Sequence, residues 1–280
     1  MRAAVGPALE RLQGFWRGYW AASDPEAIAA DIEARLAAAV EAWRLSEVAP
    51  IGEGNVALVC SATRAGESVV LKVNPRRHPE EGLIAAAAVA LEFWLPTGTA
   101  VRLLDERDAR MTLLLERVAP GDSLDDSERP WEEKLEILGH LVARLHAAGS
   151  APRSIPALAD YAALWRQYLD DPGLTGELDA LVADGAEGVL LHGDLHPGNA
   201  LRAAEGWTAI DPTAIRGDRH ADVWALICPQ APVDGRFRER VERYSDAAGL
   251  DPERAVAWAR VRAAAECSDW IAAEDVARIA

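Results

Sequence analysis

Apolar residues recur every four positions between Ile28 and Val40, a spacing that places them on one face of a helix. Just before this stretch, Ser23-Asp24-Pro25-Glu26 has the capping-box pattern with proline in the first turn. We therefore predict that residues 1–46 form two helices, and we assign the bulky Trp16 to packing between them and their surroundings.

Short runs of β-branched and aliphatic residues, separated by turns, continue up to residue 117. Such runs predict strands, and the longer apolar run among them has the length of a helix. The expected elements are strands within 50–59, 68–73, 101–104 and 111–116, a helix at 79–95 and a charged turn at 105–110.

The rest of the chain is mainly helical, because apolar residues fall on one face of each of several long stretches. Two short apolar runs, at 189–191 and 207–210, predict buried strands. We therefore expect a region of strands followed by a mainly helical region. The expected helices are 130–148, 161–169, 174–182, 237–247, 251–263 and 264–279, with another beginning within 217–224.

Composition narrows the classes of protein to consider. Half of the 280 residues are apolar, which excludes a disordered chain, and the net charge of −16 argues against a nucleic-acid or anionic-membrane partner. Three cysteines without metal-ligand spacing are typical of reduced intracellular thiols. With no signal peptide and no apolar run long enough to cross a bilayer, we expect a cytoplasmic protein. We also expect a monomer or weak dimer.

One polar loop carries several groups that bind metal or accept protons. The apolar run 189–191 ends at His192, and the glycine and proline residues that follow force a turn. The loop holds Asp194 and Asn199, five positions apart, and Asp211 follows the next apolar strand. The alternative interpretation is a polar surface turn after a core strand.

His192-Gly193-Asp194-Leu195-His196-Pro197-Gly198-Asn199, together with Ile210-Asp211-Pro212 and Gly217-Asp218, resembles the aminoglycoside phosphotransferases. Within them the chain is most similar to the branch of streptomycin 6-kinases and hydroxyurea phosphotransferases. The resemblance implies a protein-kinase-like, two-lobed α+β fold with a small antiparallel sheet in the N-lobe and a mainly helical C-lobe. The implied parts are an N-terminal helical extension at 1–46, a nucleotide-binding N-lobe at 47–117 and a C-lobe at 118–280.

The resemblance also implies roles for the loop residues. In kinase catalytic loops an Asp accepts the proton of the acceptor hydroxyl and an Asn five positions later binds Mg²⁺. Asp194 would accordingly be catalytic, while Asn199 and Asp211 would hold Mg²⁺. We assign His192 and Asp222 a structural role in holding the backbone of the loop.

A lone lysine lies inside the apolar strand 68–73 and needs an anionic partner, because burying an unpaired ammonium costs several kcal/mol. The resemblance makes the phosphates of ATP that partner. The alternative for the Gly-rich turn before this strand is a surface hairpin. For residues 116–121 the alternative is an ordinary loop that leaves a strand. Nucleotide binding is then assigned to Gly52, Gly54, Asn55 and Lys72, and adenine contacts to the backbone of Glu116 and Val118.

The helix expected at 79–95 departs from the pattern of the family. Ala87 stands where the glutamate that pairs with the lysine is expected, and the nearest acids upstream are Glu80 and Glu81. A shifted helix would be needed for Glu81 to reach Lys72. Reduced or conditionally assembled activity is therefore one possible consequence.

Two acids and an indole near the C-terminus are candidates for binding the acceptor. Glu266, Asp269 and Trp270 would lie together on the last helix, where they suit a cationic or polyhydroxylated ligand. The alternative is an amphipathic terminal helix with Trp270 in the core and the acids in solvent.

The sequence as a whole predicts an ATP- and Mg²⁺-dependent small-molecule O-phosphotransferase. The resemblance favours a streptomycin-type aminoglycoside kinase that confers antibiotic resistance, with a small and cationic acceptor. Two alternatives stay open: a nucleotide-binding pseudokinase that acts as a sensor, and a kinase for hydroxyurea or another small hydroxyl metabolite.

Overall fold

The computed structural model describes residues 2–19, 22–52, 54, 56–76, 81–185 and 188–279. The chain divides into two compact units, one made of residues 1–92 and 101–117 and the other of residues 93–100 and 118–280. None of the helices in the described residues combines the length and apolarity that crossing a bilayer requires.

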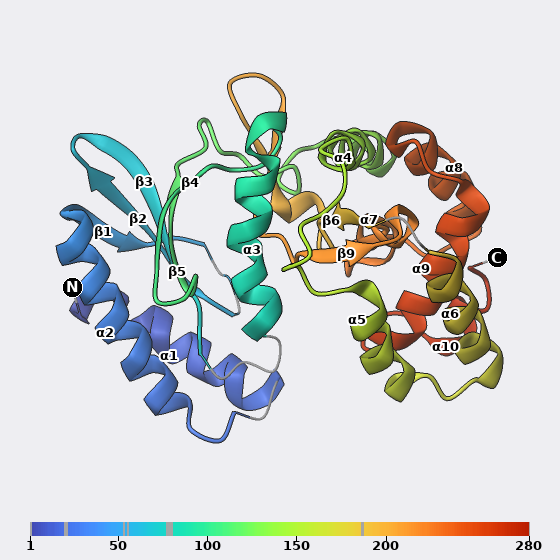
Figure 1. Ribbon diagram of the computed structural model, residues 1–280, viewed down its shortest axis with the longest axis horizontal. Coiled ribbons are helices and arrows are strands. Elements are labelled where there is room, and N and C mark those ends of the chain that lie inside the picture. The colour runs from blue at the N-terminus through green and yellow to red at the C-terminus, as the bar shows by residue number, and fades with distance from the viewer. Residues whose placement is uncertain are drawn as a thin grey trace. The chain divides into compact units, whose positions relative to one another are not determined.

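The first unit is built on a five-stranded antiparallel sheet with the strand order β1-β2-β3-β5-β4 (Figure 1). Alternate residues of β2 and β3 point into a buried core, as period-two patterning requires. The strands are β1 (Leu45–Pro50), β2 (Leu58–Arg64), β3 (Glu67–Val73), β4 (Leu103–Arg107) and β5 (Thr112–Glu116).

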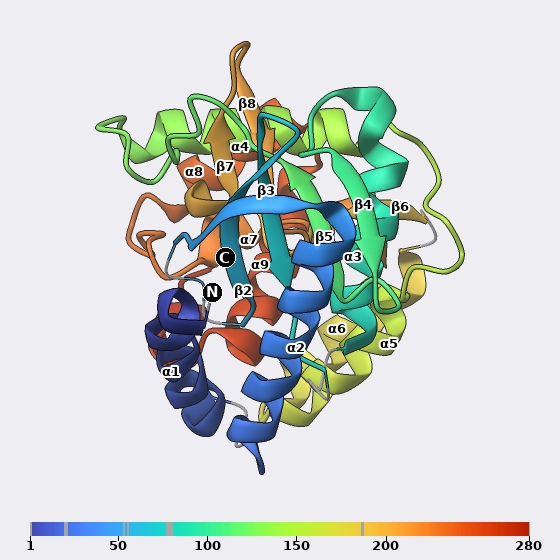
Figure 2. The same cartoon turned by 90° about the vertical axis from the view of Figure 1, so that its left-hand side faces the viewer.

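Helices α1 (Arg2–Tyr19) and α2 (Pro25–Trp43) cover one face of this sheet, and α3 (Glu81–Trp94) lies on its other side (Figures 1 and 2). Helix α2 begins where the capping pattern predicts, but its cap is Asp24 and not Ser23: the Asp24 carboxylate accepts a hydrogen bond from the backbone N of Ala27 at 2.9 Å, and Pro25 is the first helical residue. The two N-terminal helices share one hydrophobic core with the sheet.

A buried arginine fastens α2 to the strands. Arg35 donates through Nη2 to the carbonyl of Asn74 at 2.6 Å and through Nη1 to the carbonyl of Met111 at 3.3 Å. These carbonyls lie just after β3 and just before β5. The helix therefore stabilises the strand ends as well as the core beneath them.

The second unit is mainly helical around two short two-stranded antiparallel sheets. Its helices are α4 (Trp131–His146), α5 (Leu158–Trp165), α6 (Pro172–Asp184), α7 (Trp224–Ile227), α8 (Phe237–Ala248), α9 (Pro252–Glu266) and α10 (Ala273–Val276). One sheet pairs β6 (Val189–Leu191) with β9 (Ile215–Gly217), and the other pairs β7 (Ala200–Arg202) with β8 (Trp207–Ala209). Sheet in one unit and helices in the other give the α+β class that the sequence predicts.

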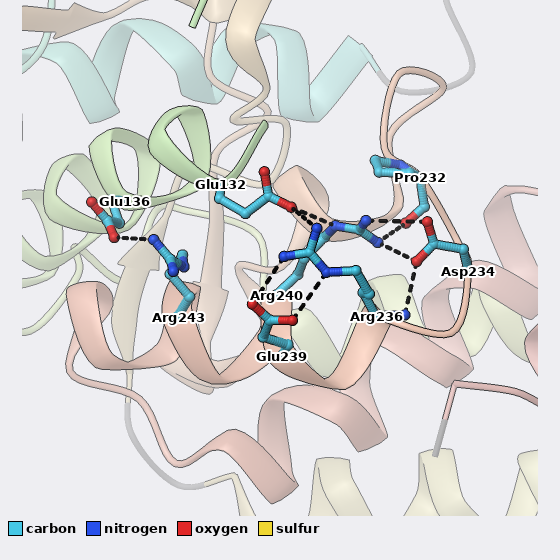
Figure 3. Close-up of polar contacts among 8 residues, drawn as sticks. All are labelled: Glu132, Glu136, Pro232, Asp234, Arg236, Glu239, Arg240 and Arg243. Atoms are coloured by element: carbon cyan, nitrogen blue, oxygen red, sulfur yellow. Dashed lines mark hydrogen bonds and ion pairs between the residues drawn. The ribbon is translucent and has the colours of Figure 1, made fainter. Parts of the chain in front are cut away.

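Helices α4 and α8 pack closely, and a charged network crosses their contact (Figure 3). Gly139 permits the approach, because a Cβ there would lie 2.7 Å from the Cβ of Ala247. Buried Arg240 donates through Nη1 to the carbonyl of Pro232 at 3.0 Å and to Oδ1 of Asp234 at 2.7 Å. The network thus anchors the segment that connects α7 to α8.

Several predicted boundaries are wrong. The strands expected within 50–59 are instead β1, which ends at Pro50, and β2, which begins at Leu58. Strand β4 continues to Arg107, so the turn begins at Asp108 and not at residue 105; residues 108, 109 and 110 all have positive φ. The helix expected within 217–224 is a 3₁₀ turn at Arg219–Ala221 followed by the four-residue α7. Asp218 and Asp222 interrupt it, because their side chains accept hydrogen bonds from distant parts of the chain, Asp218 from the Trp258 indole and Asp222 from the backbone N of His192.

A further error concerns the C-terminus, where helices were expected at 251–263 and 264–279. Helix α9 instead continues to Glu266, and the chain turns at Cys267, whose carbonyl accepts from the backbone N of Trp270 and of Ile271 at 3.0 and 2.7 Å. The Trp270 indole donates to the carbonyl of Ile227 at 2.9 Å. This tertiary contact stabilises a break that helical periodicity cannot reveal.

Candidate active site

The loop after β6 has a conformation that its glycine makes possible. Gly193 has φ of +78°, and a Cβ at this position would collide with the carbonyl oxygen of Thr213. Any other residue would be strained and crowded there. The loop then continues through Asp194 into a 3₁₀ turn at Pro197–Asn199 and on into β7.

A buried carboxylate holds the backbone of this loop. Asp222 is 1% exposed. Its Oδ2 accepts a hydrogen bond from the backbone N of His192, and its Oδ1 accepts one from the backbone N of Gly193, both at 2.9 Å. His146 of α4 approaches the same Oδ2 through Nε2 at 3.1 Å. Asp222 thus joins the backbone of His192 and Gly193 to α4.

Asp194 and Asn199 are in direct contact. The Asn199 amide nitrogen donates to the backbone carbonyl of Asp194 at 2.9 Å and to its Oδ2 at 3.1 Å. With its nitrogen turned toward Asp194, the Asn199 side chain presents its carbonyl oxygen in another direction. The five-residue spacing therefore orients a carboxylate and an amide oxygen together.

Burial disfavours the charged forms of two ionisable side chains in this loop. Burial, followed by the negative charge of Asp211, raises the pKa of Asp194 to about 7, while Arg262 and the Asn199 hydrogen bond act in the opposite direction. Burial likewise lowers the pKa of His192 to about 4, so that its imidazole is neutral near pH 7.

The two histidines of the loop act on its backbone. His192 donates through Nε2 to the carbonyl of Ile210 at 3.0 Å and stacks on Trp94, with ring centroids 6.1 Å apart. This bond links the end of β6 to the chain just after β8. His196 accepts from the backbone N of Gly198 through Nδ1 at 3.1 Å and so caps the 3₁₀ turn.

The donors near the loop suit a magnesium ion. Asp211 is exposed, has φ of +56°, and lies close enough to Asp194 for its charge to act on the pKa of that residue. Within the described residues no cluster of three or more His, Cys, Asp or Glu side chains could hold a metal by itself. Mg²⁺ commonly takes one or two carboxylates plus substrate phosphates and water, so Asn199 and Asp211 fit such a site.

In the first unit, the predicted lysine lies in the middle of the sheet. Lys72 is half-buried on β3, paired with Val59 of β2 and Leu113 of β5. Ala87 is 6% exposed in the middle of α3, and Glu81 is exposed in its first turn. Glu80, the other candidate for pairing with the lysine, lies outside the described residues.

Helix α1 bonds the backbone at Gly54 and Val56 of the glycine-rich segment, so Trp16 does more than the packing that the sequence predicts for it. Buried Trp16 donates through Nε1 to the carbonyl of Val56 at 3.1 Å, and Arg11 donates to that of Gly54 at 2.9 Å. Gly52 has φ of +70°, whereas Asn55 lies outside the described residues. Side chain to backbone bonds across some 40 residues leave no periodic signal in a sequence.

The segment assigned to adenine begins at the end of β5. The backbone N of Glu116 donates to the carbonyl of Arg102 at 3.0 Å, so this N–H is already used and the Glu116 carbonyl, as an acceptor, is the group that could contact an adenine amino group. Val118 is buried, and Gly121 has φ of +86° with a Cβ position 2.7 Å from the carbonyl oxygen of Val118. Gly121 therefore allows a turn that other residues would obstruct.

The three acceptor candidates do not share a helix. Glu266 ends α9 and accepts from Nε of Arg262 at 2.7 Å, and its charge raises the pKa of Asp194. Asp269 is exposed in the following turn. Trp270 is 38% exposed and packs edge-on against Trp224, so both the shared helix and the alternative of a core tryptophan are wrong.

Comparison with known protein families and solved structures shows which proteins the chain is similar to. The sequence model of one family, described as aminoglycoside/hydroxyurea antibiotic resistance kinase, matches residues 42–274. No curated protein sequence matches the chain.

Solved structures with a similar fold include choline kinase LicA from Streptococcus pneumoniae and a structure of LicA in complex with AMP. One has a TM-score of 0.61 and 15% identity, covering 88% of this chain and 90% of that chain. The other, in complex with AMP, has a TM-score of 0.59 and 17% identity, covering 79% and 80%. Macrolide 2′-phosphotransferase MphH from Brachybacterium faecium has a TM-score of 0.55 and 21% identity, covering 89% and 96%. These similarities confirm the predicted protein-kinase-like fold.

Proposed function

The chain belongs to the family of aminoglycoside/hydroxyurea antibiotic resistance kinases, and we propose that it phosphorylates a hydroxyl group of a streptomycin-type aminoglycoside with ATP, conferring resistance. Membership of the family makes the protein an O-phosphotransferase that acts on a small molecule. The observation that carries the proposal is the contact of Asp194 with Asn199 on a loop held from below by Asp222.

Asp194 is the proposed proton acceptor. Its carboxylate would hydrogen-bond the acceptor hydroxyl, orient it toward the γ-phosphorus and take its proton as the new bond forms. A pKa of about 7 improves it as a base near neutral pH, since general bases work best when their pKa lies near the working pH. Asn199 keeps the carboxylate in one orientation.

Asn199 and Asp211 are the proposed ligands of Mg²⁺. When bound, the ion would neutralise charge on the transferred phosphoryl group and its leaving oxygen. The amide oxygen of Asn199 is available for this role because the amide nitrogen is used by Asp194. Asp211 supplies the negative charge that a cation site requires.

Lys72 and the segment 52–56 are the proposed phosphate-binding groups. The crystal structure of LicA in complex with AMP supports nucleotide use by this fold. An ammonium inside an apolar sheet suits an anionic ligand, and Gly52 and Gly54 allow the backbone to approach phosphate oxygens. Asn55 would contribute to binding the nucleotide beside these glycines, and the backbone of Glu116 and Val118 would bind adenine.

The proposed acceptor is cationic because the protein carries a net charge of −16 and because Glu266, near the catalytic loop, is a carboxylate. Glu266, Asp269 and the exposed face of Trp270 would bind its charged or hydroxylated groups. The description of the family also names hydroxyurea, which is neutral, so hydroxyurea or another small hydroxyl compound is the second candidate within the enzyme class.

A nucleotide-binding sensor is the candidate from another class, and buried Ala87 is the observation that favours it. Without a glutamate at this position the lysine would be positioned less well. If this costs about 1.4 kcal/mol at the transition state, turnover falls about tenfold and is not abolished. A tenfold loss would still leave an active enzyme, and the contact between Asp194 and Asn199 favours the enzyme over the sensor.

The direct test is a transfer assay with labelled ATP and Mg²⁺ against streptomycin, other aminoglycosides and hydroxyurea. Phosphorylated streptomycin is the expected product. Thermal stabilisation by Mg-ATP without transfer to any acceptor would instead identify a sensor and contradict the proposal.

Asp194→Asn is expected to reduce kcat by about a hundredfold or more, the usual contribution of a general base. Binding of ATP, measured by calorimetry, should change by less than about twofold, because the side chain acts on the acceptor hydroxyl. Asp246→Asn, a matched change of an exposed carboxylate on α8, is the control and should leave kcat unchanged. Retained turnover in Asp194→Asn would exclude the proposed role.

A further inference from the structure

We propose that Arg262 of α9 is a positioning residue that fixes the peptide group preceding Asp194 and thereby sets the rate of phosphoryl transfer. The inference rests on the phosphotransferase activity proposed above and assigns part of it to a helix outside the catalytic motif. Nothing in the spacing of the sequence indicated this arginine, which lies 68 positions beyond Asp194.

Arg262 bonds two carbonyl groups of particular importance. It is 4% exposed and donates through Nη2 to the carbonyl of Gly193 at 3.2 Å and through Nη1 to that of Ala221 at 2.9 Å. Gly193 immediately precedes Asp194, and Ala221 immediately precedes Asp222. One guanidinium group therefore links the chain before the proposed base to the chain before the carboxylate that supports the loop.

Gly193 is held on both sides as a result. Its N–H donates to Oδ1 of Asp222 at 2.9 Å, and its carbonyl accepts from Arg262. Gly193 has positive φ, and as a glycine it would otherwise have a broad conformational range, since it lacks the steric limits of other residues. Bonds to Asp222 and Arg262 restrict that range and so restrict where the Asp194 side chain points.

The surroundings of Arg262 fix the guanidinium itself. Its Cζ lies 5.2 Å from the ring centroid of Trp165 and 5.1 Å from that of Trp224, which is cation–π distance for both. Its Nε donates to Glu266 at 2.7 Å, which offsets the buried charge. Only a planar group with several donors satisfies two indoles, two carbonyls and a carboxylate at once, so lysine is not an equivalent replacement.

Arg240 provides a matched comparison. It is another buried arginine of the second unit, and its hydrogen bonds go to the Pro232 carbonyl and to Asp234, with Glu132 nearby at 3.6 Å (Figure 3). A purely structural role for buried arginines predicts that Arg262→Lys and Arg240→Lys act alike. Positioning of Asp194 predicts that only Arg262→Lys affects the catalytic step.

The first experiment compares these two variants in thermal unfolding and steady-state kinetics. Both are expected to lower Tm. Arg262→Lys should lower kcat by about 10- to 100-fold, as expected for a misplaced catalytic group, with KM for ATP changed by less than about twofold. Arg240→Lys should keep kcat within about threefold of the wild type. Equal effects on kcat in the two variants would overturn the proposal.

Chemical rescue is the second measurement. Arg262→Ala leaves a slot between two indoles that a free guanidinium ion fits, so added guanidinium at non-denaturing concentration should raise kcat about tenfold or more, whereas ammonium at the same ionic strength should not. Arg240→Ala should show no rescue of kcat. If guanidinium and ammonium act alike on Arg262→Ala, the positioning role is excluded.

Hydrogen exchange decides the question without any acceptor. The amides of His192 and Gly193 should exchange at least about tenfold faster in Arg262→Lys than in the wild type and should be unaffected in Arg240→Lys. If the wild type transfers no phosphate to any acceptor, the proposed function fails while the exchange measurement still tests the arginine. Unchanged exchange at both amides would refute the proposal for Arg262.

Discussion

Single side chains act at this site mainly through the backbone. Asp222 accepts two backbone N–H groups, His192 donates to the Ile210 carbonyl and Arg262 donates to the carbonyl of Gly193. Asp194 alone is assigned a direct chemical step. A short reactive loop that must bend sharply has few bonds of its own, so residues elsewhere in the chain must satisfy and restrain it.

The neutral, buried imidazole of His192 gives a testable dependence of stability on pH. Burial lowers its pKa to about 4 in the folded chain, against an ordinary value near 6.5 when unfolded. As pH falls below about 6.5, the unfolded chain therefore takes up a proton that the folded chain does not, and folding is disfavoured. His192→Gln has no such titration.

The free energy of unfolding of the wild type relative to His192→Gln should accordingly decline by up to about 3 kcal/mol between about pH 6.5 and pH 4. Urea unfolding of both proteins at several pH values measures this difference. Because each remaining titratable group is common to the two proteins, its contribution largely cancels. A difference that does not vary with pH would show that His192 is not held neutral.

At the scale of elements, the two N-terminal helices are joined to the sheet of the first unit by a shared hydrophobic core and by specific hydrogen bonds. Arg35 of α2 holds the end of β3, the strand of Lys72, and α1 bonds the glycine-rich segment through Trp16 and Arg11. Hydrogen bonds to the carbonyls of Gly54 and Val56 restrict the backbone that would approach phosphates. Support from α1 would reduce the entropy lost when this backbone orders around ATP.

Trp16→Phe tests that support. The change keeps most of the buried ring but removes the hydrogen bond to the Val56 carbonyl, which is worth about 1 kcal/mol. KM for ATP is expected to rise about fivefold, with a small change in kcat. Trp43→Phe, the same change at another buried indole of this core, is the control. Equal KM values for both variants would assign Trp16 to packing alone.

The charge of the whole molecule affects how it meets an acceptor. A net charge of −16 produces a negative field that attracts cations over distances comparable to the Debye length. Contacts within the site set the chemistry, whereas this field acts on the rate of encounter. The dependence on salt therefore separates a cationic from a neutral acceptor.

Raising ionic strength from about 20 to about 300 mM should lower kcat/KM for a cationic acceptor several-fold, because salt screens the attraction. For a neutral acceptor such as hydroxyurea, kcat/KM should change little. Steady-state assays with both acceptors over a salt series make the comparison. Equal salt dependence for the two would mean that the net charge has no role in acceptor capture.

The sequence by itself determined the α+β class, most strands and helices, and the local geometry of the loop from His192 to Asn199. Local interactions set these features: apolar periodicity places an element, glycine and proline force a turn, and a five-residue spacing brings Asp194 against Asn199. The capped start of α2 at Asp24 is likewise a local property.

Only the tertiary structure decided which distant residues hold that loop and where α9 ends. Arg262 meets Gly193, Trp16 meets Val56, and Trp270 meets Ile227 through hydrogen bonds between groups some 40 to 70 positions apart. Such bonds depend on how elements pack and on which buried polar groups need a partner, neither of which leaves a periodic pattern. For this reason the helix predicted at 264–279 is wrong and Arg262 was not predicted.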